Sequence, residues 1–332
     1  MLDSARIRAR TPPRSSRPRL RPLDFVRSYG ALVALAALFA FNVAFTPNFL
    51  SVQTFNVNMT QVTGIVIVAV GMTLVIATGG IDLSVGSLMA IAGASAPLIF
   101  TNWPGPVGLA AAFVVPILLA GAFGLFNGVL VARYRIQPII ATLVLFIAGR
   151  GIAQVMTNGN LQTFSNPGFQ WIGLGKLFGV PIQVFIMVAV VALFAWVVRA
   201  TAFGRYVLAT GGNEAAARLA GIPVGPVKMA VYAISGLLCG LAGLIVIAIN
   251  SSADANLIGL GIELDAIAAV AVGGTLLTGG RALVAGTLVG ALIIQLVRYT
   301  LLANGVPEAA ALVVKAAIIV LAVCIQRQGR SS

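Results

Sequence analysis

The sequence predicts an all-α protein: a polytopic bundle of about ten transmembrane helices with both termini on the cytoplasmic side. Hydrophobic residues make up 59% of the 332 residues and charged residues only 9%, so there is more apolar surface than a soluble core can bury. The mean hydropathy of +1.03 places this excess along most of the chain. Apolar stretches of about 20 residues, the length that spans a bilayer, recur from end to end.

The spans follow one another with mostly short loops. Their predicted ranges are 29–46, 57–77, 84–101, 108–132, 138–157, 180–199, 228–250, 262–279, 282–302 and 307–325. We therefore divide the chain into a tail at 1–28, a transmembrane domain at 29–326 and a second tail at 327–332. Segment 1–28 holds eight Arg in a Pro-rich sequence, which is typical of a disordered cytoplasmic anchor.

The basic residues orient the bundle. In the predicted topology only Lys176 lies clearly in an outer loop, whereas the inner segments hold the N-terminal arginines and Arg133, Arg135, Arg199, Arg205, Arg218, Lys228, Arg281, Arg327 and Arg330. An excess of Lys and Arg on the inner side is the usual membrane pattern. The net charge of +13 therefore indicates membrane lipid as a partner and no nucleic acid.

The composition leaves little for catalysis. Histidine is absent, and Cys239 and Cys324 are the only cysteines. A zinc site, a Cys/His nucleophile and a disulfide framework are therefore not expected. The chain also lacks the GxxxxGK[ST] loop that cradles nucleotide phosphates. We expect no catalytic residue, no metal and no cofactor, and therefore no enzyme activity in this chain.

Two loops leave the membrane for some distance. The outer loop 158–179 is rich in Gly, Asn and aromatic residues, which suits a re-entrant or surface-lying segment with Trp171 at the interface. The inner loop 200–227 contains a short helix signal, with Asn213 as N-cap, Glu214 in the first turn, and Gly221 as a stop. This helix is either an incidental turn or a docking element for a cytoplasmic partner.

The sequence contains two similar segments that indicate an internal repeat. The segment "VAVGMTLVIATGGIDLSVGSLMA" (68–90) resembles "VAVGGTLLTGGRALVAGTLVG" (270–290). Both read as a span, a Thr-Gly-Gly break and a second span. Repeats of this kind are common in transporters.

Several motifs resemble one known family. They are "VIATGGIDLSVGSLMAIAGA", "GRYVLATGGNEAAARLAGIPV", "IELDAIAAVAVGGTLLTGGR" and "GTLVGALI". In this order, over about 57–325, they resemble the permeases of ribose-type ABC sugar importers. The stretches "RIQPIIATLVLFIAGRGIAQ" and "SSADANLIGLGIELDA" look most like the galactofuranose importer permease.

The resemblance implies a complex in a bacterial inner membrane. Two permease subunits would form the pathway, a cytoplasmic ATPase with two nucleotide-binding domains would drive it, and a periplasmic binding protein would deliver the sugar. The helix from Asn213 to Gly221 is similar to the coupling helix that contacts the ATPase. Its predicted contact residues are Glu214, Ala215, Ala216 and Arg218.

Polar residues within the spans are candidates for the sugar path, because such residues face the bundle interior or water. Asp82 and Ser84 follow Gly79 and Gly80 at the inner end of the second span. They either cap the third span or line a broken helix in the path. Further candidates are Phe126, Asn127 and Gln154.

Three acids lie on the predicted outer side. They are Asp254, Glu263 and Asp265. Helix capping explains the last two, and contact with a binding protein or an entering sugar is the alternative. Arg150 either pairs with one of these acids or reaches the outer surface.

Three other functions compete with the sugar importer. An ion-coupled secondary transporter normally needs titratable residues in mid-membrane, and here the acids cluster near span ends. A membrane enzyme lacks the residues for chemistry. A permease for branched-chain amino acids would favour matched charges in the path, and the sequence does not show them.

Overall fold

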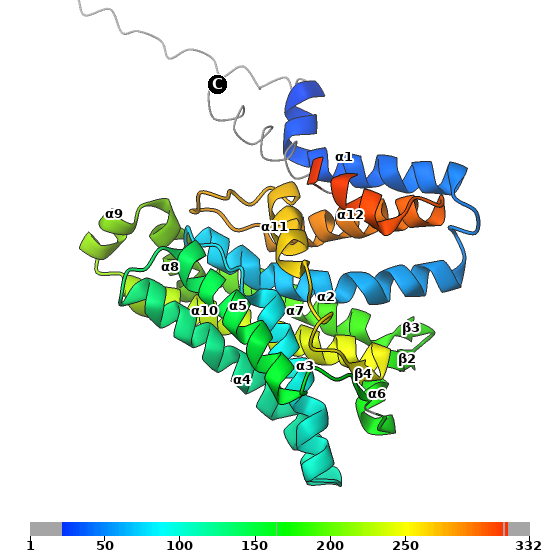
Figure 1. The fold of residues 1–332 in the computed structure, drawn as a ribbon. Helices are drawn as coiled ribbons and strands as arrows, with labels where there is room; N and C mark the ends of the chain where they lie inside the picture. The colour runs from blue at the N-terminus through cyan, green and yellow to red at the C-terminus, as the bar shows by residue number, and fades with distance from the viewer. Residues whose placement is uncertain (1–21, 164, 315, 318–332) are drawn as a thin grey trace, which may run out of the picture.

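The computed structural model describes residues 22–163, 165–314 and 316–317, and helices make up most of it (Figure 1). Within this part of the chain, seven helices are long and apolar enough to cross a membrane. They are α2 (Val52–Ala77), α3 (Val85–Asn102), α4 (Pro106–Ala132), α5 (Pro138–Met156), α7 (Ile182–Ala200), α10 (Val224–Asn250) and α12 (Val284–Ala303). Each coincides with a predicted span. The helical, polytopic class is therefore confirmed, and the count of ten stays a prediction.

The two ends of the chain account for part of the difference. Helix α1 (Pro22–Phe45) carries an apolar stretch at Gly30–Phe45 that is shorter than a full span. It begins inside the segment that we assigned to a disordered tail, so residues 22–28 are helical. Residues 1–21, the C-terminal tail and positions 315 and 318–325 of the predicted last span lie outside the described residues.

The predicted span 262–279 is wrong as one continuous helix. Helix α11 (Ile262–Val272) has only 11 residues, and an irregular segment then leads to α12. Gly274 has a left-handed φ of +85°, which ends the helix. A Cβ added at Gly273 would overlap the backbone of Gly286. The end of α11 therefore packs closely against the start of α12, which small residues permit. The chain turns there instead of continuing as a helix to residue 279.

Helix α2 forms the centre of the bundle. Every residue from Val62 to Ala77 is buried, and α7, α10, α11 and α12 pack around the helix. A helix that is apolar on all sides is typical of such a position. Helices α4 and α10 also pack closely against each other. A Cβ added at Gly124 would lie 3.0 Å from the Cα of Gly236.

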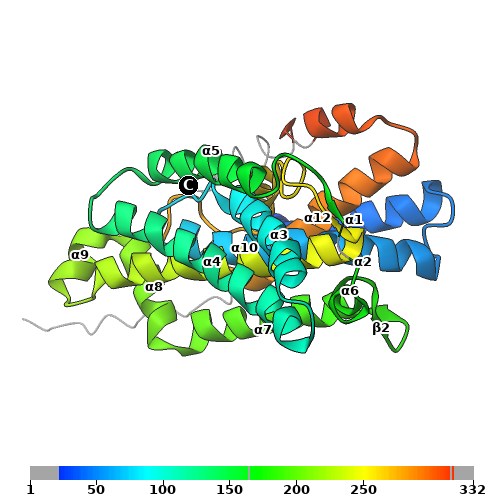
Figure 2. The ribbon, with the colours of Figure 1, turned by 60° about the horizontal axis from the view of Figure 1, so that its bottom comes forward.

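Short elements close one end of the bundle. Strand β1 (Gln162–Thr163) pairs antiparallel with β4 (Ser252–Ala253), and β2 (Lys176–Leu177) with β3 (Val180–Pro181). Helix α6 (Pro167–Leu174) packs against α7 and α10 and leaves Trp171 exposed. Helices α8 (Ala202–Gly212) and α9 (Glu214–Leu219) lie at the opposite end from α6 (Figures 1 and 2). The two long loops are therefore on opposite sides, as the predicted topology requires.

Candidate functional site

The predicted short helix in the loop 200–227 is confirmed as α9. The side chain of Asn213 accepts a hydrogen bond from Ala216 N at 3.0 Å, as an N-cap does. Gly221, with φ +80°, lies just beyond the end of the helix, and its N–H donates to the carbonyl of Arg218. Helix α8, which precedes α9, was not predicted. Its signal in the sequence is Thr201, whose hydroxyl caps the helix through Gly204 N.

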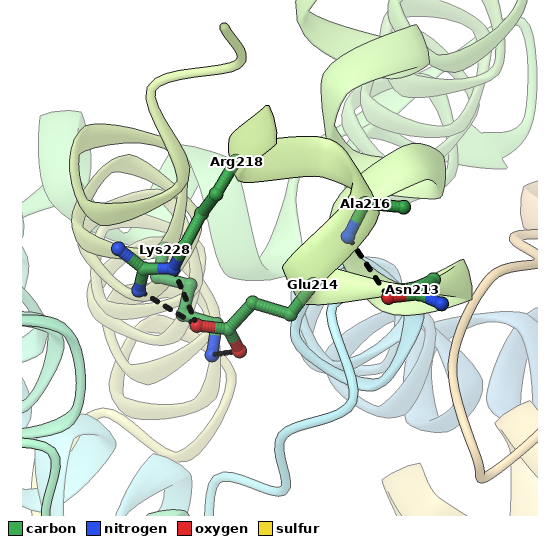
Figure 3. A network of polar contacts seen from close by, with 5 residues as sticks. All are labelled: Asn213, Glu214, Ala216, Arg218 and Lys228. Atoms are coloured by element: carbon green, nitrogen blue, oxygen red, sulfur yellow. Dashed lines mark hydrogen bonds and ion pairs between the residues drawn. The ribbon is translucent and has the colours of Figure 1, made fainter. Parts of the chain in front are cut away.

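Ion pairs hold α9 against the bundle (Figure 3). Glu214 accepts from Arg218 Nη2 at 2.7 Å and from Lys228 Nζ at 2.6 Å. Lys228 belongs to α10, so the second pair joins two helices. Hydrogen bonds from Lys228 and Arg218 lower the pKa of Glu214 below its usual value. Glu214 and Arg218, predicted as contact residues, are thus already engaged within this chain.

The outward face of α9 is apolar. Ala217 is buried, whereas Ala215 and Ala216 are exposed and Leu219 is 92% exposed. Sequence reasoning missed Leu219, although it follows Ala215 by four residues and so shares its face.

Asp82 is fully enclosed. Its Oδ1 accepts from Ser84 N at 3.0 Å and Ser84 Oγ at 2.6 Å, and its Oδ2 accepts from Ser235 Oγ at 3.1 Å. Asn127 Nδ2 donates to Ser84 Oγ at 2.9 Å. The network joins the segment between α2 and α3 to α4 and α10. Irregular backbone at membrane depth is tolerated where protein buries it, and protein rather than an open path surrounds Asp82 here.

Two glycines shape this segment. Gly79 has φ +82°, which a side chain would disfavour. A Cβ added at Gly80 would lie 2.5 Å from the hydroxyl oxygen of Tyr232. The break that the sequence predicts at these glycines, between one span and the next, is therefore confirmed. Leu83 N donates to Thr142 Oγ1 on α5 at 3.1 Å, so α4, α5 and α10 all hold the segment.

The other path candidates are not brought together. Phe126 is 50% exposed and Asn127 fully buried, so these neighbours point to different sides of α4. Gln154 donates to Asn256 at 2.8 Å. It lies twelve residues beyond Thr142 on α5, which is about 18 Å along a helix. Only Asn127 joins the group formed by Gly79, Gly80, Asp82 and Ser84.

The acids predicted on the outer side lie at different depths. Asp254 accepts from Asn256 N at 2.9 Å and is partly exposed. Glu263 and Asp265 are each 8% exposed. A Cβ added at Gly259 would lie 2.9 Å from the Cα of Gly86 in the first turn of α3. The segment before α11 therefore re-enters the bundle, and α11 begins inside it rather than at its outer surface.

Arg150 holds this re-entrant segment. Its Nη1 donates to the carbonyls of Ala255 at 2.8 Å and Ile258 at 2.6 Å. The described residues contain no ion pair of Arg150 with a carboxylate within 4.0 Å. A search of the same residues finds no group of three or more His, Cys, Asp or Glu that could hold a metal ion.

Comparison with known proteins gives a consistent result. A family model described as "Branched-chain amino acid transport system / permease component" matches residues 55–323. The chain is 45% identical over 305 residues to a ribose import permease protein of Escherichia coli (strain K12), covering 90% of this chain and 93% of that protein. It is also 45% identical over 265 residues to a galactofuranose transporter permease protein of the same strain, covering 80% and 76%. An L-arabinose ABC transporter permease protein of Azospirillum brasilense is 35% identical, covering 93% and 90%. No solved structure matches the chain.

Proposed function

Because the chain belongs to the transport-system permease family that this model describes, and to its ribose-type sugar permeases, we propose that it is the membrane-spanning permease subunit of an ATP-driven (ABC) monosaccharide importer. The observation that carries the proposal is 45% identity to a ribose import permease over 90% of the chain. The matched residues 55–323 run from α2 past the end of α12, which supports our proposal of a permease domain at 29–326.

The sugar is ribose-like or a form of galactose. A ribose permease and a galactofuranose permease share the same identity with this chain, and a fructose import permease of Bifidobacterium longum is 39% identical. All three sugars named by these relatives are small neutral polyols.

Helix α9 is the element that contacts the ATPase. Its exposed apolar face, with Leu219 at the end, is suited to a hydrophobic groove. Glu214, Arg218 and Lys228 position the helix and surround this face with charge. Asn213 and Gly221 fix where the helix begins and ends. A rigid short helix on the end of the bundle is able to pass motion of the ATPase into the membrane domain.

The complex contains further subunits. ATP is hydrolysed by a separate cytoplasmic ATPase with two nucleotide-binding domains, and a periplasmic binding protein presents the sugar near Asp254. A second permease, identical or different, completes the pathway. The chain lies in a bacterial inner membrane with both termini in the cytoplasm, which places α9 on the same side as the ATPase.

Co-purification and uptake test the proposal. The tagged chain is extracted in mild detergent from its native membranes, and the proteins that accompany it are identified by mass spectrometry. We expect a stoichiometric ATPase with two nucleotide-binding domains and, in proteoliposomes with the binding protein, ATP-dependent uptake of labelled ribose or galactose. Uptake driven by an ion gradient without ATP would instead support a secondary transporter.

The description of the family model favours one competitor, an importer of branched-chain amino acids. The same proteoliposomes distinguish the two substrates. Excess unlabelled ribose or galactose should block the uptake, and leucine should not. Saturable leucine uptake that ribose does not inhibit would show that the substrate is an amino acid and not a sugar.

A further inference from the structure

Three Thr-Gly-Gly triplets that lie far apart in the sequence meet in the structure. The first, at 78–80, follows α2, and the second, at 278–280, precedes α12. A third copy, at 210–212, ends α8 immediately before Asn213 and the helix α9. A hydrogen bond links the two that resemble each other in sequence: Gly280 N, in the triplet 278–280, donates at 3.0 Å to the carbonyl of Ala77, the residue just before the triplet 78–80.

Gly211 packs against the two backbone groups that form this hydrogen bond. A Cβ added there would overlap the Ala77 carbonyl oxygen and would lie 2.7 Å from Gly280 N. It would therefore clash with the acceptor and crowd the donor of this hydrogen bond. A Cβ added at Gly279 would in turn lie 2.9 Å from the carbonyl oxygen of Gly211 and 3.0 Å from Gly79 N. The three triplets thus contact one another backbone to backbone, with no side chain between them.

Each triplet belongs to an element with a different task. The triplet 210–212 is one residue away from the cap of α9. The triplet 78–80 leads into the buried network of Asp82. The triplet 278–280 ends the irregular segment between α11 and α12. Closely packed elements tend to shift between discrete arrangements rather than to deform continuously, so a displacement of α8 cannot leave the other two segments where they are.

Two buried hydroxyls beside the junction support a second arrangement. Among the described residues, Thr210 Oγ1 and Tyr232 Oη have no hydrogen-bond partner. Tyr232 Oη is the group that faces Gly80. A buried hydroxyl without a partner is unfavourable by about 1–3 kcal/mol. Both groups therefore stand to gain hydrogen bonds when the triplets move relative to one another.

We propose that Gly211 is the positioning residue for coupling: it transmits movement of α9 to the α2–α3 segment and to the segment before α12. This inference rests on the proposed function, because α9 must move with an ATPase. It assigns the route that the movement takes inside the permease. The absence of a side chain at Gly211 is what keeps the three segments in register.

Two neighbouring glycines give a matched test. Gly211→Ala inserts a methyl group into the junction, whereas Gly212→Ala adds the same methyl group where nothing lies within 4 Å. Both changes are made in the complex with its ATPase and binding protein, and both variants are checked for assembly. The readout is sugar transported per ATP hydrolysed in proteoliposomes. We expect Gly211→Ala to lower this ratio about tenfold, a typical coupling effect, while ATPase activity persists and Gly212→Ala matches the wild type.

A measurement on the wild-type complex covers the case in which Gly211→Ala does not assemble. Hydrogen exchange is followed with and without a trapped nucleotide in peptides covering 76–84, 207–214 and 276–284. We expect the three to change together, with 252–258 as the reference. A wild-type coupling ratio in an assembled Gly211→Ala complex, or a change confined to 207–214, would overturn the inference. Failure of the wild-type complex to transport sugar would instead count against the proposed function.

Discussion

Lys228 and Glu214 connect the short helix α9 to the long helix α10, with 2.6 Å between Lys228 Nζ and Glu214 Oε2. The pair spans 14 residues of sequence and crosses the turn at Gly221. A six-residue helix is too short to be stable alone, so this connection, together with burial of Ala217, sets where α9 lies. The apolar face that carries Leu219 is thereby held outward.

Lowering the pH should loosen α9. Hydrogen bonds from Lys228 and Arg218 lower the pKa of Glu214 when α9 is packed on α10. The stabilisation of this packing by the ionised carboxylate is therefore complete above the ordinary glutamate pKa of 4.5. It is lost as the pH falls through the lowered pKa of Glu214. The groups are partly exposed, so each pair contributes only about 0.5 kcal/mol. A spin label at Ala220→Cys should show greater mobility at acid pH.

The matched control for this experiment is Glu214→Gln. It keeps the shape of the side chain but cannot be ionised, so the label should be mobile at neutral pH and insensitive to acid. A pH response of equal size in Glu214→Gln would assign the loosening to another group.

Replacing Leu219 with Asp should weaken binding of the ATPase. The substitution places a charge on the proposed apolar contact face, and loss of a buried apolar anchor typically weakens an interface by about 2 kcal/mol, or some thirtyfold in affinity. Co-purification of the ATPase in detergent measures this. Leu174→Asp serves as the control, because Leu174 is 56% exposed at the opposite end of the bundle. Equal loss in both variants would point to general damage.

Removing the Asp82 carboxylate should destabilise the bundle and impair transport. Asp82→Ala leaves the donors of Ser84 and Ser235 unpaired, which costs about 1–3 kcal/mol for each buried group. Asp82→Asn keeps one acceptor and should be less severe. Thermal unfolding in detergent and sugar uptake are measured together, with the sugar affinity of the binding protein unchanged. Wild-type stability and uptake in Asp82→Ala would show that the network is dispensable.

Arg150→Ala should release the segment before α11. The change removes the Nη1 group that donates to the carbonyls of both Ala255 and Ile258, which then lack this partner inside the bundle. Hydrogen exchange in a peptide covering 252–260 should rise, while a peptide covering 207–214 stays unchanged. Arg150→Lys, which offers a single ammonium group, should lie between the two. Protection equal to the wild type in Arg150→Ala would mean that the glycine contacts alone hold the segment.

Local signals in the sequence predicted much of this structure. Asn213 and Gly221 marked the two ends of α9 because capping depends on neighbouring residues only. The seven long helices followed from apolar length alone. The turn at Gly79 was readable for the same reason, since glycine is the residue that adopts positive φ freely.

Features that depend on distant contacts were not readable. Helix α11 ends at Val272, where Gly274 adopts a positive φ and Gly273 packs on Gly286, and the apolar length of this segment alone does not separate it from a full span. Phe126 and Asn127 are adjacent in sequence, yet the packing of α4 exposes one and buries the other. The meeting of Gly211 with Ala77 and Gly280 likewise depends on the arrangement of three separate elements.

The central position of α2 has a consequence for how the protein is made. From Val62 to Ala77 this helix has no side left for lipid, yet α7, α10, α11 and α12, which enclose it, are all synthesised later. The nascent α2 must therefore first be stable as an isolated apolar helix in the bilayer, before its neighbours displace the lipid around it. Its uniformly apolar sequence thus serves two environments in turn, first as an inserted segment and then as the core of the finished domain.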